Sequence, residues 1–255
     1  MVPPAAPLER IRLLEALAAN AWPAATVETL AGWRLSLDRG VTRRANSVIA
    51  NALQDHADPE LLIDEAERRY RARSLPPCFK LCRATAPPDL VRRLQRRGYR
   101  EEGLSHVLTR AVGVGPRTAP AAGVSLTRLE EPEAAWLGAC WPSATAHALA
   151  AQHGIVARIG LPRVFMLAAV DGHAAGAGLG VCEAAHVCLT AIHTLPHQRR
   201  RGVGRSIIAA IAGWGQERAA DLLYLQVEAD NLAALRLYAG EGFSHHHDYR
   251  YACLP

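Results

Sequence analysis

Hydrophobic positions in the second half of the chain switch between the two-residue spacing of strands and the spacing of three to four residues typical of helices. These patterns predict strands at residues 124–129, 163–170, 174–181, 186–194, 222–228 and 244–252, and helices at 130–139, 145–158, 205–219 and 231–241. The Asp171-Gly172 pair between two of the strands is typical of a hairpin turn. Strands and helices that alternate in this way predict an α/β fold.

The end of the first half is similar to the end of the second half. In both, a helical pattern ends at a glycine followed by an aromatic residue, at 98–99 and at 242–243, and a strand pattern follows. Aligning these pairs places Leu94 of the first half at the position of Tyr238. A hairpin is also predicted over residues 33–48, so we interpret the first half as a repeat of the same fold.

Residues 112–123 separate the two halves. They show no hydrophobic period and are rich in Gly, Pro and Ala, which predicts a linker. The 255 residues of the chain are therefore divided into an N-terminal domain, 1–111, and a C-terminal domain, 124–255, each of ordinary domain size.

The composition favours a folded protein that does not span a membrane. Half of the residues are hydrophobic (50%), yet no apolar run reaches the roughly 18 residues that a membrane helix needs. The first residues lack the basic region and apolar stretch of a secretory signal. The six cysteines show no Cys-x-x-Cys spacing, and we expect them to be reduced and mostly buried. These features predict a cytoplasmic protein.

The formal net charge of +5 reflects a basic excess in the first half, where two arginine runs lie at 68–73 and 92–97 on helical patterns. Such runs usually form solvated helix faces. A nucleic-acid surface is the alternative, but no aromatic residues are interleaved with the arginines, so a nucleic-acid partner is not favoured.

The clearest candidate site follows the predicted strand 186–194 and opens the predicted helix 205–219. It consists of Arg199, Arg200, Arg201, Gly202, Val203, Gly204 and Arg205. Backbone N–H groups at a helix start carry partial positive charge and bind anions. Glycines 202 and 204 leave room for a phosphate to approach the backbone, and the arginines add charge. This pattern predicts a pyrophosphate site for a nucleotide or coenzyme A.

Two other phosphate-binding patterns do not occur in the sequence. A dinucleotide fingerprint needs three glycines and an acidic residue about 20 positions later. A nucleoside-triphosphate loop needs Gly-Lys-Ser or Gly-Lys-Thr, whereas Lys80 is the only lysine of this chain.

The residues that follow complete a pattern that resembles the Gcn5-related N-acetyltransferase (GNAT) family over about residues 124–254. The matching residues are, in order, Arg199, Gly202, Gly204, Asn231, Leu237, Tyr238, Gly242 and Phe243. The resemblance implies a mixed, mostly antiparallel sheet flanked by helices, in which two strands splay to form a cofactor slot. The repeated ending of the first half, which lacks the glycine segment, implies a tandem arrangement with a degenerate N-terminal copy.

The resemblance also implies that the cofactor is acetyl-CoA. Backbone groups of Ile192, His193 and Thr194 would bond its pantetheine arm as an added strand would, the alternative being an ordinary paired strand. Tyr238 would be the general acid, the alternative being a core aromatic residue. Asn231 would bond the cofactor or support the loop, and a helix N-cap is an alternative that can coexist.

An acceptor amine must lose a proton before it can attack, which calls for a base. The predicted strand 186–194 contains no carboxylate. The candidates are His193, Glu183 and His186, and we place His193 first because imidazole titrates near neutral pH. An ordinary structural or exposed position is the alternative for each.

Three further residues, Trp141, His147 and His153, lie in or beside helices that the resemblance places over the acceptor site. Trp141 is either a wall of that site or a core residue. Residues 245–247 are all histidine, but neighbours on a strand point to opposite faces, so we predict no metal site.

These observations predict an acetyl-CoA-dependent N-acetyltransferase that acts by direct attack of a primary amine within a ternary complex. The acceptor would be a small molecule or a peptide, and the N-terminal domain would shape its cleft. Alternatives from other classes are a non-catalytic acyl-CoA sensor and a nucleic-acid-binding adaptor. We expect no membrane partner, and a monomer or homodimer.

Overall fold

The computed structural model describes residues 6–114 and 120–254, which form two compact units. Unit 1 comprises Met1–His106 with His246–Pro255, and unit 2 comprises Val107–His245. Each unit has its own hydrophobic core. The N-terminal residues 1–5 and the centre of the predicted linker, 115–119, lie outside the described residues.

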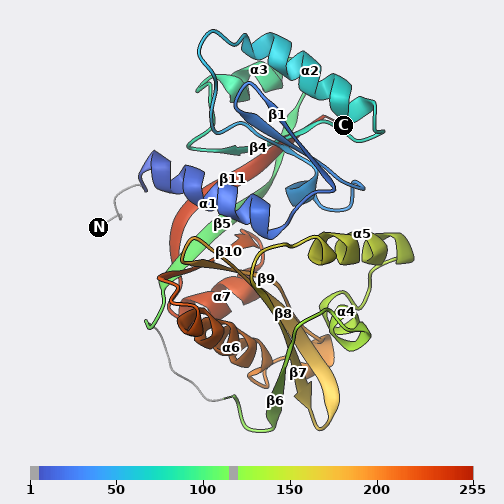
Figure 1. Cartoon of the computed structure of the whole chain (residues 1–255), viewed down its shortest axis with the longest axis vertical. Helices are drawn as coiled ribbons and strands as arrows, with labels where there is room; N and C mark the ends of the chain where they lie inside the picture. The colour runs from blue at the N-terminus through green and yellow to red at the C-terminus, as the bar shows by residue number, and fades with distance from the viewer. Residues whose placement is uncertain (1–5, 115–119, 255) are drawn as a thin grey trace. The chain divides into compact units, whose positions relative to one another are not determined.

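Unit 2 is a mixed sheet with helices on both faces (Figure 1). Its complete elements are β6 (Val124–Leu129), α4 (Ala134–Cys140), α5 (Ala146–Ala157), β7 (Arg163–Val170), β8 (His173–Glu183), β9 (His186–Thr194), the 3-10 turn η2 (Pro196–Gln198), α6 (Val203–Glu217), β10 (Leu222–Glu228) and α7 (Leu232–Gly240). The strand order is β5-β10-β9-β8-β7-β6, in which β5 is Arg100–Ala111. Strands β6 to β9 pair antiparallel, and β9 pairs parallel with β10. The predicted fold is confirmed.

Unit 1 repeats the central part of this topology. Its elements are α1 (Leu8–Ala21), β1 (Thr26–Leu30), β2 (Trp33–Leu37), the 3-10 turn η1 (Arg43–Ala45), β3 (Val48–Ile49), α2 (Pro59–Arg71), β4 (Cys78–Cys82) and α3 (Leu90–Arg96). Helix α2 connects the parallel pair β3 and β4, as α6 connects β9 and β10. The two copies also end their last helices alike. Tyr99 N donates to Leu94 O at 3.1 Å, and Phe243 N donates to Tyr238 O at 3.0 Å.

Two strands, β5 (Arg100–Ala111) and β11 (Ser244–Cys253), pass from one unit into the other. The end of β5, from Val107, lies in unit 2, where β5 neighbours β10. The end of β11, from His246, lies in unit 1 and pairs antiparallel with β4. The compact units therefore differ in their bounds from the predicted domains, 1–111 and 124–255. The assignment of catalysis to the second domain stays a prediction.

Three alternate positions of β8, residues 176, 178 and 180, are glycine, so this part of one face of the strand carries no side chains. A Cβ on Gly178 would lie 2.5 Å from Cγ2 of Ile207, and one on Gly180 would lie 2.7 Å from Cγ2 of Ile211. At Gly176 it would lie 2.6 Å from a main-chain oxygen. Helix α6 therefore packs directly on the main chain of β8, which only glycine permits at this distance.

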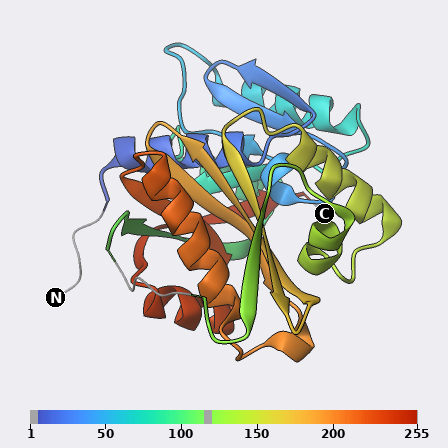
Figure 2. The same cartoon turned by 60° about the horizontal axis from the view of Figure 1, so that its bottom comes forward.

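Helix α4 lies on the opposite face of the same strands. The ring of Trp136 packs edge-on against Phe165 of β7, with 5.0 Å between the centroids. Phe165 is paired with Leu179, which points away from the glycine face because side chains alternate along a strand. Figures 1 and 2 show α6 on one side of β7–β9, and α4 with α5 on the other.

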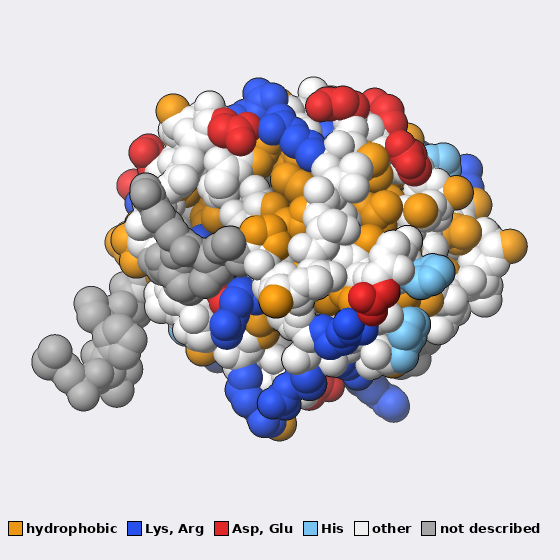
Figure 3. Space-filling model, turned by 90° about the horizontal axis from the view of Figure 1, so that it is seen from below, with side chains coloured by type: hydrophobic (Ala, Val, Ile, Leu, Met, Phe, Trp, Pro, Cys, Tyr) orange, Lys and Arg blue, Asp and Glu red, His pale blue; other side chains and the backbone are white. Residues whose placement is uncertain are grey.

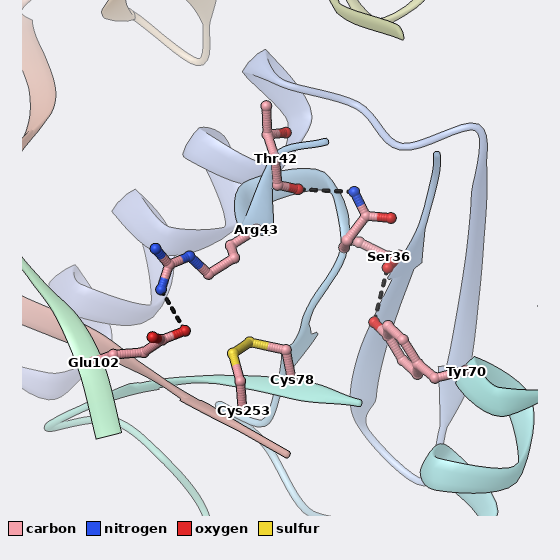
Figure 4. Close-up of a disulfide and its surroundings, with 8 residues drawn as sticks. Ser36, Thr42, Arg43, Tyr70, Cys78, Glu102 and Cys253 are labelled. Atoms are coloured by element: carbon pink, nitrogen blue, oxygen red, sulfur yellow. Dashed lines mark hydrogen bonds and ion pairs between the residues drawn. A yellow bond between two sulfur atoms is a disulfide. The ribbon is translucent and has the colours of Figure 1, made fainter. Parts of the chain in front are cut away.

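Two of the six cysteines form a disulfide, so the prediction that all are reduced is wrong. Cys78 in β4 lies directly opposite Cys253 in β11, and their sulfur atoms are bonded (Figure 4). The sequence separation of 175 residues hides this pairing, because it arises from strands that meet only in the fold. Cysteine content therefore no longer supports a cytoplasmic location. Within residues 6–114 and 120–254, no helix is long and apolar enough to cross a bilayer.

The arginine runs of unit 1 are paired with carboxylates. Arg69 lies 2.7 Å from Glu28 and 2.6 Å from Glu65, and Arg97 lies 2.7 Å from Glu60. Arg69 belongs to α2 and Arg97 directly follows α3, and neighbouring acidic side chains balance the charge of both.

We expect Gly180→Ala to lower the free energy of unfolding by about 1–3 kcal/mol, because the new methyl group would overlap Ile211. Gly213→Ala is the matched control, since no atom lies within 4 Å of its Cβ position in α6. There we expect a gain of about 0.5–1 kcal/mol. Urea denaturation measures both, and equal stability of the two variants would contradict the flat packing face.

Candidate active site

Strands β9 and β10 diverge at the candidate site. Their parallel ladder covers four residue pairs and ends at Leu189 and Leu225, although both strands continue. Ile192, His193 and Thr194 of β9 lie beyond that point and are half-buried. Main-chain groups on such a free edge can pair with an extended ligand. The splayed slot expected from the sequence is present.

β9 carries a bulge in this diverging segment. Toward β8, Thr190 pairs with Leu179 and His193 pairs with Ala177, which leaves two residues of β9 opposite one of β8. Ala191, within the bulge, has a left-handed φ of 50°. A bulge bends the main chain and changes where the following side chains point. The strand end predicted to bind the pantetheine arm therefore begins at a bulge.

The segment after β9 leads into a helix that begins without a side-chain cap. The N-cap residue of α6 is Gly202, with a φ of 80°, and Arg200 also has a left-handed φ of 65°. By contrast, Asn231 and Thr145 cap α7 and α5 with hydrogen bonds of 3.1 and 3.2 Å. The first N–H groups of α6 lack such an acceptor, so this helix end is suited to an anion.

Neighbouring side chains leave no space for a Cβ at Gly202 and little space at Gly204. A Cβ on Gly202 would lie 2.4 Å from Cβ of Ala121. One on Gly204 would lie 3.0 Å from Cδ2 of Leu237 and 3.5 Å from Oγ1 of Thr194. The expectation that these glycines let a phosphate approach the main chain stays a prediction. The same contacts bring the start of α6, the end of β9 and helix α7 together.

Arg199 and Arg200 are exposed, and neither side chain has a hydrogen-bond or ion-pair partner among residues 6–114 and 120–254. Arg201 is tied to its surroundings, because it donates to Gln198 Oε1 at 3.0 Å and lies 3.1 Å from Asp171 Oδ2. Figure 3 shows the end of the molecule that is lowest in Figure 1, where several groups of basic side chains reach the surface. Two guanidinium groups thus remain available to a ligand's phosphates.

Arg205 contacts a buried protein carboxylate. Its Nε lies 2.8 Å from Oε1 of Glu241, which follows α7 and is fully buried. Arg110 donates to the main-chain oxygen of Glu241 at 2.6 Å, and burial lowers the pKa of Arg110. These contacts join the start of α6 to the end of α7. The guanidinium of Arg205 therefore has a structural partner, which leaves its main-chain N–H for the predicted cofactor contact.

Tyr238 lies in α7 and is buried, with its ring 5.9 Å from that of Phe243. Burial raises the pKa of Tyr238 to about 12, so its hydroxyl is protonated at neutral pH and can donate a proton. Asn231 caps the same helix, because its Oδ1 accepts from Ala234 N at 3.1 Å. The N-cap interpretation of Asn231 is confirmed, and a role toward the cofactor stays a prediction.

His193 is the candidate base that lies at the slot. Its Nδ1 is 2.8 Å from the carbonyl oxygen of Ala139, which can only accept, so Nδ1 is the donor and Nε2 is the acceptor of the neutral ring. His186 is the first residue of β9, and Glu183, the last residue of β8, pairs with it. The seven residue steps from His186 to His193 span roughly 20 Å, so neither Glu183 nor His186 is placed to act there.

The residues predicted to flank an acceptor are on α5 and beside α4. Trp141 is half-buried and packs against Trp136 at 5.5 Å, while His147 and His153 are exposed. Trp141 therefore contacts the core, and its role as a wall of the acceptor site stays a prediction.

Of the three adjacent histidines, His245 is exposed, His246 is half-buried and His247 is buried. In unit 1, His247 Nε2 lies 3.1 Å from Glu15, which pairs with Lys80 at 2.6 Å. This histidine therefore belongs to a buried ion-pair network.

The corresponding helix of unit 1 begins with negative charge. Asp58 caps α2 and accepts from Glu60 N at 2.9 Å, and Pro59 at the helix start has no N–H. Glu60 adds a second carboxylate to the first turn. At the start of α2, Pro59 has no N–H and the N–H of Glu60 is taken by Asp58, so fewer donors are open to an anion than at the start of α6, which agrees with a degenerate first copy.

Sequence reasoning did not single out Glu241, the contacts of α4 with β9, or the glycine face of β8. The Gly-x-Gly-x-Gly spacing at 176–180 was an available signal for close helix packing. Glu241 gave no such signal, because its pairing with Arg205 depends on how two helices pack.

Two comparisons of sequence concern nearly the whole chain. The family described as "Probable histone acetyltransferase Rv0428c C-terminal" matches residues 9–252. The uncharacterized N-acetyltransferase YobR of Bacillus subtilis (strain 168) is 27% identical over 263 residues, which cover 95% of this chain and 99% of that protein. The probable histone acetyltransferase Rv0428c of Mycobacterium tuberculosis is 30% identical over 256 residues, covering 94% of this chain and 73% of that protein.

Solved structures share the fold over most of the chain. A GCN5-related N-acetyltransferase from Kribbella flavida superposes with a TM-score of 0.72 at 16% identity, covering 96% of this chain and 95% of that one. A tandem GNAT protein from the clavulanic acid biosynthesis pathway gives 0.68 at 12% identity, covering 94% and 87%. Since the family match also extends over residues 9–252, the chain belongs to the GNAT family of N-acetyltransferases.

Proposed function

We propose that this protein is an acetyl-CoA-dependent N-acetyltransferase, with its cofactor site between the diverging strands β9 and β10 and the start of α6. The observation that carries the proposal is the uncapped start of α6 beside the free edge of β9. A helix start suits a pyrophosphate, and a free strand edge suits a chain of amide groups. Coenzyme A contains both, one after the other.

The residues present fit this cofactor. The first N–H groups of α6, with Arg199 and Arg200, would hold the phosphates. Main-chain groups of Ile192, His193 and Thr194 would hold the pantetheine arm, because they lie beyond the part of β9 that pairs with β10. When bound, acetyl-CoA would supply the acetyl group as an activated thioester.

Two side chains would move protons. Nε2 of His193 would accept a proton from the acceptor ammonium, so that the neutral amine can attack directly. The Tyr238 hydroxyl, kept protonated by its raised pKa of about 12, would give its proton to the departing sulfur.

The acceptor we propose is a primary amine of a small molecule or peptide, bound together with the cofactor. The description of one relative as a probable histone acetyltransferase keeps peptide amines among the candidates.

A non-catalytic acyl-CoA sensor is the second candidate. It is favoured by the lack of a carboxylate on β9 and by the distance of Glu183 and His186 from the slot. Release of free CoA during incubation with acetyl-CoA and a panel of amines separates the two functions. An acetyltransferase releases CoA in proportion to the acetylated amine, whereas a sensor binds acetyl-CoA and releases none.

We expect Tyr238→Phe to lower turnover by about 10²-fold, because it removes the proton donor while keeping the ring that packs on Phe243. The affinity for acetyl-CoA should change little, since most contacts come from α6 and β9. Steady-state kinetics and calorimetry measure the two quantities. Full activity of the variant would show that the hydroxyl is not the acid, and a large loss of affinity would make it a binding group.

One acetyl-CoA should bind per chain. Unit 2 offers an uncapped helix start, whereas the Asp58 carboxylate occupies the matching position in unit 1. Isothermal titration calorimetry gives the stoichiometry directly. A value of two would refute the assignment of unit 1 as a copy without a cofactor site.

Arg199→Gln and Arg205→Gln should separate ligand binding from stability. We expect Arg199→Gln to weaken acetyl-CoA binding by roughly threefold to tenfold, because a free cation is lost. Arg205→Gln should lower the free energy of unfolding by about 1–3 kcal/mol, because buried Glu241 loses its counter-ion. This range is smaller than that for breaking a fully buried ion pair, because the Arg205 side chain is exposed. The reverse pattern, in calorimetry and urea denaturation, would contradict these roles.

A further inference from the structure

Helix α4 is fastened to the bulged part of the sheet by three hydrogen bonds. They are Trp136 Nε1 to Gly178 O at 3.1 Å, Cys140 Sγ to Ala191 O at 2.8 Å, and His193 Nδ1 to Ala139 O at 2.8 Å. All three join α4 to residues within or next to the bulge of β9 and the facing position of β8.

The bulge explains why α4 supplies these bonds. The antiparallel ladder of β8 and β9 shifts its register between the pairs Ala177–His193 and Leu179–Thr190. Gly178 and Ala191 lie within this shift. Carbonyl groups at such a shift lose their usual partners, and a buried carbonyl without a donor is costly. Trp136 and Cys140 are both buried, and their N–H and S–H groups donate to the carbonyl groups of Gly178 and Ala191.

We propose that Cys140 is a positioning residue of the acetyltransferase site. Its thiol holds the carbonyl of Ala191 and thereby fixes the bulge that carries His193. The neighbouring carbonyl, that of Ala139, holds the imidazole with Nδ1 as the donor and Nε2 as the acceptor. The inference rests on the proposed function, in which Nε2 of His193 accepts the proton.

Two properties of the site support this role. Burial raises the pKa of the Cys140 thiol well above its usual range, so the group stays an S–H donor rather than becoming a thiolate nucleophile. Ala191 has a left-handed φ of 50°, which is unfavourable for a residue with a Cβ and persists only where neighbouring contacts hold it. The bond from Cys140 is such a contact.

The test compares Cys140→Ala, Cys140→Ser and the control Cys182→Ala. Cys182 is also a buried free thiol, but it pairs with Val187 near the start of β9, away from the bulge. The first readout is the tautomer of the His193 ring, observed by nitrogen-15 NMR of the imidazole. The second readout is kcat with the amine that gives the fastest CoA release, together with the Kd for acetyl-CoA.

We expect the wild-type His193 ring to carry its proton on Nδ1, and Cys140→Ala to give a mixture of tautomers. In that variant kcat should fall by about tenfold or more, with the Kd for acetyl-CoA within about twofold of the wild type. Cys140→Ser should restore both readouts, because its hydroxyl can donate to the same carbonyl. Cys182→Ala should change neither.

An unchanged tautomer and kcat in a folded Cys140→Ala variant would overturn the proposal, as would equal effects of Cys182→Ala. If Cys140→Ala does not fold, Cys140→Val fills the volume of the thiol without a donor and is judged by the same results. A wild-type protein that acetylates no amine would refute the proposed function. The NMR readout would still decide whether Cys140 sets the His193 ring.

Discussion

The candidate site depends on where the pairing of β9 and β10 stops. Parallel strands satisfy one another's main-chain groups only while they remain side by side. Beyond Leu189 and Leu225 the two strands separate, so one edge of β9 is left open to a ligand. On its other edge, toward β8, β9 bulges. Helix α4 supplies hydrogen-bond donors to the carbonyl groups of Gly178 and Ala191 at this bulge. The same strand then turns at η2 into α6, whose uncapped start lies against Thr194 and α7. The segment of β9 that leaves its ladders therefore forms both the slot and the bulge, and the uncapped start of α6 follows directly in the chain.

Local patterns in the sequence were sufficient to locate these elements. The bounds of β6, β7, β9 and β10 coincide with the predicted strands, because apolar runs flanked by turn residues are signals within a few neighbouring residues. The partners of individual side chains could not be predicted, because they depend on packing between elements. Ala121 meets Gly202 only because the end of the predicted linker lies on α6, where Ala121 N donates to Ser206 at 3.0 Å. Glu241 meets Arg205, and Cys78 meets Cys253, for the same kind of reason.

The two copies show how little change is needed to close an anion site. Both contain a parallel strand pair connected by a helix, and both end the following helix with the same turn at a glycine. In α6 the helix begins at a glycine without a side-chain acceptor, whereas in α2 an aspartate and a proline occupy the start. The first copy therefore keeps the topology and the hydrophobic core while its own carboxylate takes the place of a ligand. Core packing and ligand binding make separate demands on the sequence.

The passage of β5 and β11 between the units limits how the chain can be divided. A fragment cut at residue 124 would keep the end of β11 but lack β4, its partner in unit 1. It would also lack residues 107–111, the part of β5 assigned to unit 2, in which β5 is the neighbour of β10. Each loss exposes a strand edge, and exposed edges favour aggregation. The second half alone would therefore be a poor independent protein, even with every residue of its proposed cofactor site intact. Each half needs strand segments that the other half supplies, so neither half is readily recombined with a different domain.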